Sequence, residues 1–371
     1  MRKILFIILL LVFPLVVFAE GKPLTLEESI SIALKNNSSI KLASEKINQA
    51  SAEKSQALSY LFPKIYSSSS YTRLNEELAM SIDPSTPSVI LSDDEIYDYN
   101  LGLIQPIFHG GLIPAYQLQR ENLKASQNSF EAVQNDLIME VKKAYFQVLE
   151  TEKLKQVAGE AVTQVRAHLN VVEAYFKEGM VSEVEVLRAK VVLANVQQNL
   201  INANNGWELS KSLFNSLLNR NLGEEVTLED ILYFKDYDVV LSSAISQAIN
   251  SRPEIRQMKN HLKISEEGVS IARSFFLPQV SLIGRWDKMK GAEIPVDEWT
   301  ESWSAVVSVE MDIWDWGENL NGVRKTNAQF EQMKSSFALL QNSIELEVRQ
   351  AYYNLIAAKE KIKLQEETVK E

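Results

Sequence analysis

The chain has 371 residues, a formal net charge of -11 at pH 7 and no cysteine. The acidic balance makes nucleic acids and anionic membrane surfaces poor partners, because both are negatively charged. A chain without cysteine has neither a disulfide framework nor thiol chemistry.

Residues 1–19 have the pattern of a secretory signal peptide. Arg2 and Lys3 form a positive region, an apolar run follows, and Ala19 closes a cleavage site of small residues. The apolar run is shorter than the roughly 20 residues that an anchoring transmembrane helix needs. We therefore predict that the protein is exported and that the mature chain begins at Glu20.

Two distant stretches of the chain contain the same structural unit. Residues 33–65 align without a gap onto residues 248–280, and a second aligned block pairs Tyr145 with Tyr352. Each copy is expected to contain a long helix, a pair of β-strands and another long helix. Membrane conduits and repeat arrays commonly duplicate such elongated units, whereas globular enzymes rarely do. The predicted organisation is a signal peptide at 1–19, a first repeat at 20–220, an equatorial connector at 221–242 and a second repeat at 243–371.

Four segments alternate between apolar and polar residues, which is typical of β-strands: 65–74, 97–108, 280–287 and 302–313. The last is long enough for a tilted strand to cross the hydrocarbon of a membrane, which takes roughly 9–11 residues. Its predicted lipid-facing residues are Trp303, Ala305, Val307, Val309 and Met311. Its predicted lumen-facing residues are Ser304, Ser308, Glu310 and Asp312.

A soluble antiparallel sheet with one wet face shows the same alternation, so periodicity alone leaves both interpretations open. Aromatic residues near the strand ends, among them Tyr66 and Trp314, suit the interfacial girdle of a membrane barrel. Four strands cannot close a barrel, and an open sheet edge is not tolerated in lipid. A membrane barrel would therefore need several copies of the chain.

A helix is predicted from Pro114 to about Phe176, and it would be roughly 90 Å long at 1.5 Å per residue. Its distal half carries apolar residues at seven-residue spacing, which predicts coiled-coil packing. Gly179 is expected to end this helix in a left-handed conformation. Ser182 and Glu185 have the spacing of a capping box for the next helix, as Thr25 and Glu28 have for the first one. The second helix is predicted to pack through Val184, Leu187, Val191, Ala194 and Ile201.

From about Leu24 to its end, the chain resembles the TolC-like outer membrane efflux proteins. The matching stretches are LTLEESISIALKNN at 24–37, YLFPKI at 60–65, QPIFHGG at 105–111, EVKKAYFQVL at 140–149, YFKEGMVSEVEVLRAK at 175–190 and SLLNRNLGEEV at 216–226. The resemblance implies an α+β membrane protein that forms a homotrimer. Each chain would give four strands to a twelve-stranded β-barrel and its long helices to a coiled-coil tunnel.

The resemblance also implies a location in the outer membrane, with a helical extension into the periplasm. The protein would be the exit duct of a tripartite efflux or type I secretion system, with a periplasmic adaptor and an inner-membrane pump as partners. The hairpin tip would be the adaptor contact, through Gly179, Met180, Val181, Ser182 and Glu183. Val162 of the first repeat corresponds to about Val369, so we expect the second repeat to be incomplete at its C-terminus, without the hairpin that carries most gating residues.

An enzyme is the first alternative. The three histidines, His109, His168 and His261, are far apart, and the chain has no phosphate-binding glycine loop, nucleophile elbow or zinc motif. We therefore predict no catalytic, cofactor or metal site. The second alternative is a soluble periplasmic coiled-coil adaptor or structural protein, which would be extracted without detergent. The sequence does not indicate the transported substrate or the class of pump.

Overall fold

The computed structural model describes residues 23–81, 88–292, 294 and 297–370. The predicted signal peptide and the start of the mature chain lie outside this part. The helices are α1 (Leu26–Asn36), α2 (Ser38–Ser59), α3 (Leu112–Lys177), α4 (Glu183–Leu217), α5 (Leu241–Ser251), α6 (Pro253–Ser274) and α7 (Glu318–Lys370). The strands are β1 (Lys64–Arg73), β2 (Leu78–Met80), β3 (Val89–Ser92), β4 (Glu95–Phe108), β5 (Gln279–Lys290) and β6 (Thr300–Glu310).

The chain forms two compact units. The first, which we call the hairpin unit, consists of Met1–Lys41 and Gln134–Asp236. The second, the sheet unit, consists of Leu42–Val133 and Tyr237–Glu371. Helix α3 contributes to both, because its first residues belong to the sheet unit and the rest to the hairpin unit.

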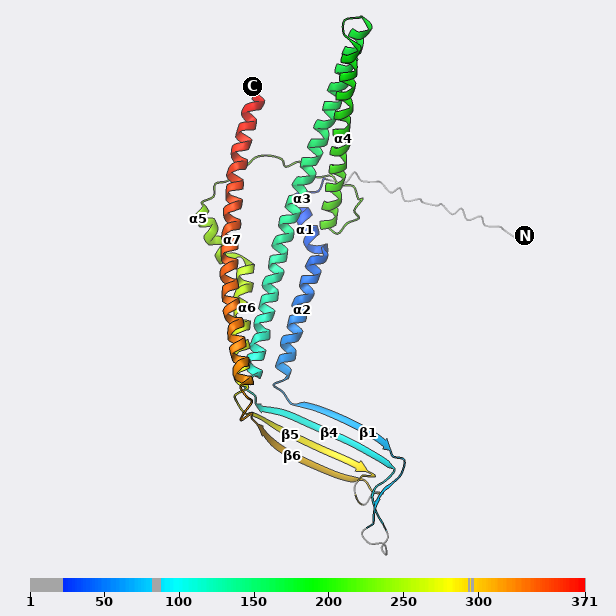
Figure 1. The fold of residues 1–371 in the computed structure, drawn as a ribbon, viewed down its shortest axis with the longest axis vertical. Helices are drawn as coiled ribbons and strands as arrows, with labels where there is room; N and C mark the ends of the chain where they lie inside the picture. The colour runs from blue at the N-terminus through cyan, green and yellow to red at the C-terminus, as the bar shows by residue number, and fades with distance from the viewer. Residues whose placement is uncertain (1–22, 82–87, 293, 295–296, 371) are drawn as a thin grey trace, which may run out of the picture. The chain divides into compact units, whose positions relative to one another are not determined.

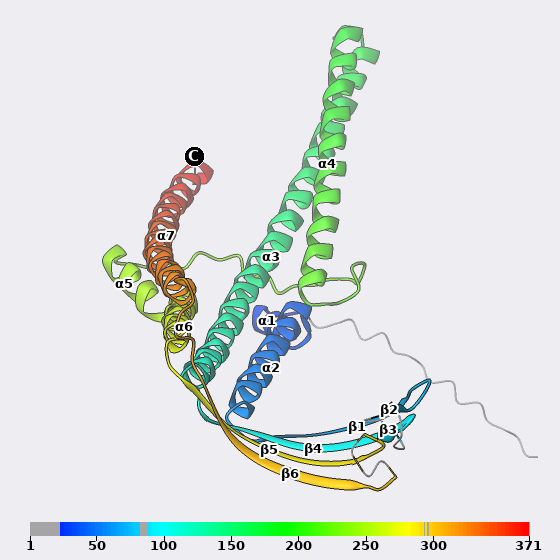
Figure 2. The ribbon, with the colours of Figure 1, turned by 60° about the horizontal axis from the view of Figure 1, so that its bottom comes forward.

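A curved antiparallel sheet with the strand order β1-β4-β5-β6 dominates the sheet unit (Figures 1 and 2). Strands β1 and β4 come from the first repeat and β5 and β6 from the second, so the central β4–β5 pair joins the two repeats. The four predicted strands are confirmed, but β6 ends at Glu310. Met311 and Asp312, predicted to face lipid and lumen, therefore lie beyond the strand. The short strands β2 and β3 pair within the connection from β1 to β4, for which the sequence predicted no strand.

The first helix of each repeat is broken, whereas the sequence predicted one long helix. Asn37 separates α1 from α2 in an extended conformation with φ -62° and ψ 135°. Its Nδ2 donates to the backbone oxygen of Leu217 at 2.8 Å, and its Oδ1 accepts from the amide of Ser39 at 2.8 Å. In the second repeat, Pro253 opens α6 at a position where its missing N–H costs nothing.

Helices α3 and α4 run side by side as an antiparallel hairpin (Figure 1). Leu169 of α3 packs with Val186 and Ala189 of α4 in a buried cluster, which Val172 and Leu193 extend. The prediction of which α4 residues pack against α3 is wrong. Val184, Leu187, Val191 and Ile201 are exposed, and so is Ala194. Helix α4 carries two apolar stripes, and it packs on α3 with the one through Val186, Ala189 and Leu193.

Of the predictions for the helix ends, some are confirmed and one is wrong. Thr25 and Glu28 form both bonds of a capping box, and Gly179 adopts the left-handed conformation with φ 73°. Ser182 occupies the N-cap position of α4, but its side chain makes no capping hydrogen bond. Glu185 pairs instead with Arg188, at 2.8 Å, and does not reach back to the helix start. The capping box predicted for α4 is therefore wrong.

Tyr145 holds the start of the described chain and the connector against α3. Its side chain is fully buried, and its hydroxyl lies 2.9 Å from the backbone oxygen of Leu24 and 2.8 Å from that of Glu229. Leu24 in turn forms a parallel bridge with Leu228. Nearby, Lys153 pairs with Asp230 at 2.8 Å and lowers the pKa of that carboxyl. The connector is thus fastened to the helices by both polar and ionic contacts.

Candidate functional site: the hairpin tip and the two faces of the sheet

The hairpin tip is closed by backbone hydrogen bonds, and the large apolar side chain of Met180 lies in solvent. The amide of Gly179 donates to Phe176 at 3.0 Å, and the amide of Met180 donates to Tyr175 at 2.9 Å. The Met180 side chain is 71% exposed. Ser182 and Glu183 are also exposed, whereas Val181 is half-buried, so Met180 is the exposed apolar side chain among the five predicted contact residues.

A hollow of about 420 Å³ lies between α3 and α4 on the tip side of the hairpin. Val165, His168 and Val172 line it from α3, and Glu185, Arg188 and Val192 line it from α4. The hollow combines an apolar floor with charged groups from α4. Together with Met180, these residues give the end of the hairpin a surface with both apolar and charged elements.

One face of the sheet, which we call the apolar face, carries mainly apolar side chains on β4, β5 and β6, whereas on β1 it carries serines beside Ile65. Cross-strand partners share a face, and the register pairs Leu282 with Val307 and Trp286 with Trp303. Val307 is 62% exposed and Trp303 79% exposed. The alternation predicted for β6 is thus present from Trp303 to Val309, and these side chains have no cover from the described chain. Apolar side chains at this density in water are unfavourable, so the apolar face requires another environment.

The opposite, polar face carries Ser304, Ser308 and Glu310 of β6, as the alternation predicted. Tyr66, expected in an aromatic girdle, also lies on this face: its partner is Gly102, and a Cβ at Gly102 would come within 2.2 Å of the tyrosine ring. The ring therefore occupies the space above the glycine. The girdle interpretation is wrong for Tyr66.

A polar hollow of about 290 Å³ opens on the polar face. Its lining includes Asp98 and Asn100 of β4 and Arg285 and Asp287 of β5. Asn100 is only 5% exposed, and its Nδ2 donates to Oδ1 of Asp287 at 2.6 Å. We call Asp98, Asn100 and Asp287 the oxygen cluster. Asp98 and Asn100 are two residues apart and so share a face of β4, but only the register brings Asp287 opposite Asn100.

A buried carboxylate links α3 and α6 within the sheet unit. Glu121 of α3 accepts from Lys124 at 2.7 Å and from the amide of Asn260 of α6 at 2.9 Å. Asn260 accepts in turn from Asn128 at 2.9 Å. Burial alone raises the pKa of Glu121, but the hydrogen bonds from Lys124 and Asn260 outweigh it, so the net shift lowers the pKa. The chain therefore keeps this carboxylate ionised.

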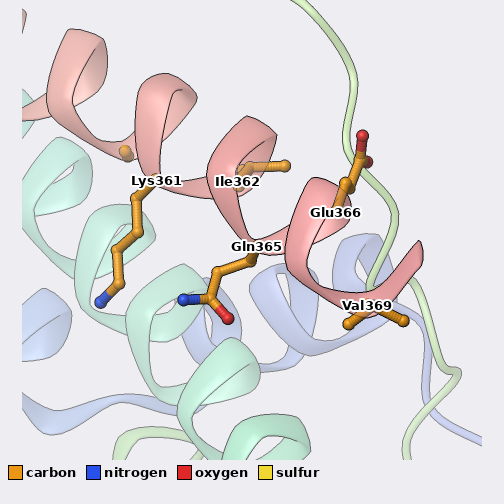
Figure 3. Close-up of a pocket in the computed structure, with 6 residues that line it drawn as sticks. Lys361, Ile362, Gln365, Glu366 and Val369 are labelled. Carbon is orange, nitrogen blue, oxygen red and sulfur yellow. The ribbon is translucent and has the colours of Figure 1, made fainter. Parts of the chain in front are cut away.

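The last turns of α7 line a further hollow, of about 630 Å³ (Figure 3). Ile362, Gln365 and Val369 lie along this stretch, and Val369 is 84% exposed. Across the described part of the chain, no helix is both long enough and apolar enough to cross a membrane. Nor do the described residues contain three or more His, Cys, Asp or Glu side chains placed to hold a metal ion.

Comparison with known proteins places the chain in a family. The family model of the outer membrane efflux proteins matches residues 29–218 and 244–371. The chain belongs to the outer membrane efflux protein family.

Two relatives share less than a quarter of their aligned residues with this chain. The pyoverdine export outer membrane protein OpmQ of Pseudomonas putida is 23% identical over 258 residues, which cover 69% of this efflux protein and 55% of OpmQ. The probable outer membrane lipoprotein SilC of Salmonella typhimurium is 24% identical over 354 residues, 87% of this chain and 72% of SilC. This chain thus spans little more than half the length of OpmQ.

The fold agrees with the family. The crystal structure of the Campylobacter jejuni CmeC outer membrane channel superimposes with a TM-score of 0.75 at 21% identity, over 91% of this chain and 74% of CmeC. The predicted α+β class, with long helices and a strand pair from each repeat, is confirmed. As a member of this family, the efflux protein is located in the outer membrane. The family and fold are those of outer-membrane channels, not those of the soluble adaptor kept as an alternative.

Proposed function

We propose that this protein is the passive exit duct of a tripartite efflux or type I secretion system. In this proposal three copies assemble, and each gives its four strands to a closed twelve-stranded barrel. The apolar face meets lipid and the polar face lines the lumen. An inner-membrane pump supplies the energy, and a periplasmic adaptor connects pump and duct.

The observation that carries the proposal is the two-faced sheet with two unpartnered outer edges. Within the described residues, β1 pairs only with β4, and β6 pairs only with β5. Unpaired strand edges are not tolerated in lipid, whereas a ring of copies satisfies every edge. Copies joined from β6 to β1 would continue the apolar face around the outside. The same face carries exposed Ile65 at one edge and exposed Val307 at the other.

The second apolar stripe of α4 supports assembly in the helical part as well. Val184, Leu187, Val191 and Ile201 are exposed on a helix whose other stripe already packs on α3. An extended apolar stripe that the chain does not cover is typical of an interaction surface. A neighbouring copy in a homotrimeric tunnel would cover it.

The hairpin tip is the proposed adaptor contact, with Gly179, Met180, Val181, Ser182 and Glu183 as its residues. Met180 supports this proposal, because its exposed side chain belongs to neither the α3–α4 cluster nor a helix cap. The hollow lined by Val165 and Arg188 offers the adaptor a place for a side chain next to the tip.

The test uses the double substitution Met180→Asp with Val181→Asp in the full-length protein, in cells that lack their own copy. We expect intact oligomers on native gels but no efflux of a fluorescent substrate and no crosslinking to the adaptor. The matched control is Met180→Leu, which keeps an apolar side chain at the tip and should keep efflux. Normal efflux by the double variant, with oligomers confirmed, would remove the tip from the proposed contact.

A further inference from the structure

The oxygen cluster on the polar face holds acceptor atoms that no donor satisfies. Oδ1 of Asp98 and Oδ1 of Asn100 are both buried, and neither has a hydrogen-bond partner in the described chain. Buried acceptors without a partner cost free energy and normally have one, either in the protein or in a bound molecule. Two of them in one hollow therefore call for a ligand that supplies positive charge or donors.

The orientation of the Asn100 amide is fixed by its neighbour. Its Nδ2 donates to the Asp287 carboxylate at 2.6 Å, and the reversed amide would bring two acceptors together. Oδ1 of Asn100 must then point away from Asp287. Asp98 precedes Asn100 by two residues, so both side chains stand on the same face of β4. The unpaired oxygens thus come from neighbouring positions.

The charges of the hollow do not cancel. Asp98 and Asp287 contribute two negative charges, and Arg285 contributes one positive charge, which leaves a net charge of one negative unit. Nε of Arg285 lies 3.6 Å from Oδ1 of Asp287, and the arginine side chain is 56% exposed. Arg285 therefore pairs with Asp287, and the formal charge of the residues that line the hollow stays negative.

We infer that the oxygen cluster is a binding site for a cation held by oxygen ligands. Two carboxylates and an amide oxygen are the ligands that Ca²⁺ and similar hard cations prefer, and they are equally suited to accept the N–H groups of an organic ammonium. The site rests on the proposed function in one respect: the polar face lines the lumen, so each copy presents one such site to the transported solutes. The duct then binds cationic solutes where the oxygen cluster faces the lumen.

The test measures binding directly on the full chain, purified in detergent. Isothermal titration calorimetry with CaCl₂ in one arm and spermidine in the other separates a metal cation from an organic ammonium. We expect saturable binding at one site per chain in at least one arm. Asp98→Asn, which keeps the shape and removes the charge, should weaken it by at least about tenfold. Asp287→Asn should weaken it as well.

Glu310→Gln is the matched control, because Glu310 is an exposed carboxylate on the same face outside the hollow. It removes the same charge and should leave the binding constant unchanged. Binding in neither arm, or binding that Asp98→Asn and Glu310→Gln change equally, would overturn the site. Ordered water would then satisfy the two oxygens.

Conductance across a planar lipid bilayer, recorded on the same preparation, reports on the proposed channel separately. A protein that conducts ions and fails the calorimetric test loses the site and keeps the channel. A protein that binds the cation and forms no conducting pores keeps the site and contradicts the proposed function.

Discussion

Tyr145→Phe should loosen the connector without disturbing the hairpin. The substitution keeps the ring and its edge-on contact with Phe214, whose centroid lies 6.1 Å away, and removes only the hydroxyl. One hydroxyl proton serves two carbonyl oxygens, and that of Leu24 also accepts from the amide of Glu229 at 3.1 Å. The net loss is therefore one hydrogen bond between neutral groups, about 1 kcal/mol. A loss of this size raises the population of the locally opened state by roughly fivefold.

Hydrogen exchange at the Leu24–Leu228 bridge measures this opening. The amides of Leu24 and Glu229 bond across the bridge, so both should exchange roughly fivefold faster in Tyr145→Phe than in the wild type. Tyr352 provides the control, since it occupies the equivalent position in the second repeat. Its hydroxyl has no hydrogen-bond partner in the described chain, so Tyr352→Phe should leave exchange unchanged. Unchanged exchange in Tyr145→Phe, or equal acceleration in both variants, would refute the reasoning.

Two further predictions concern the sheet and the α3–α6 contact. Val307→Arg puts a charge on the apolar face and should impair barrel assembly, at a cost of about 2–4 kcal/mol near the bilayer midplane. Ser308→Arg, on the polar face, should fold and alter conductance. Equal assembly defects of the two variants on native gels would contradict the proposed faces. The pKa of Glu121 is lowered in the folded protein, so its stabilising effect is complete above the ordinary glutamate pKa of about 4.3 and is lost as the pH falls through the folded value. Glu121→Gln should therefore flatten the acid side of a thermal-unfolding profile against pH, and an unchanged acid slope would contradict this role.

Patterns carried within a single segment were sufficient to predict much of this fold. Alternation located the four strands of the main sheet, and the left-handed glycine at 179 marked the end of α3. The strands β2 and β3 were not predictable in this way, because segments of three and four residues are too short to show a period. At the break after α1, Asn37 bonds to Leu217, a residue that is 180 positions away in sequence.

The candidate sites depended more on partners that the sequence does not identify. Helix α4 has two apolar stripes, and only packing shows that the one through Val186 faces α3. Ser182 and Glu185 have the spacing of a capping box, yet Glu185 pairs with Arg188, three residues further along the helix. The faces of β4 and β5 followed from alternation. The pairing of Asn100 with Asp287 required the register between strands that lie in different repeats.

The open edges of β1 and β6 have a consequence for biogenesis. In the proposed homotrimer, the outer edges of β1 and β6 obtain their hydrogen bonds only from another molecule. A single copy in the membrane would therefore have unpaired strand edges. Insertion and association then become one reaction, whose yield depends on how many copies reach the same patch of membrane within the lifetime of an exposed edge. The stability of the inserted protein consequently has no fixed value of its own and rises with the local number of copies.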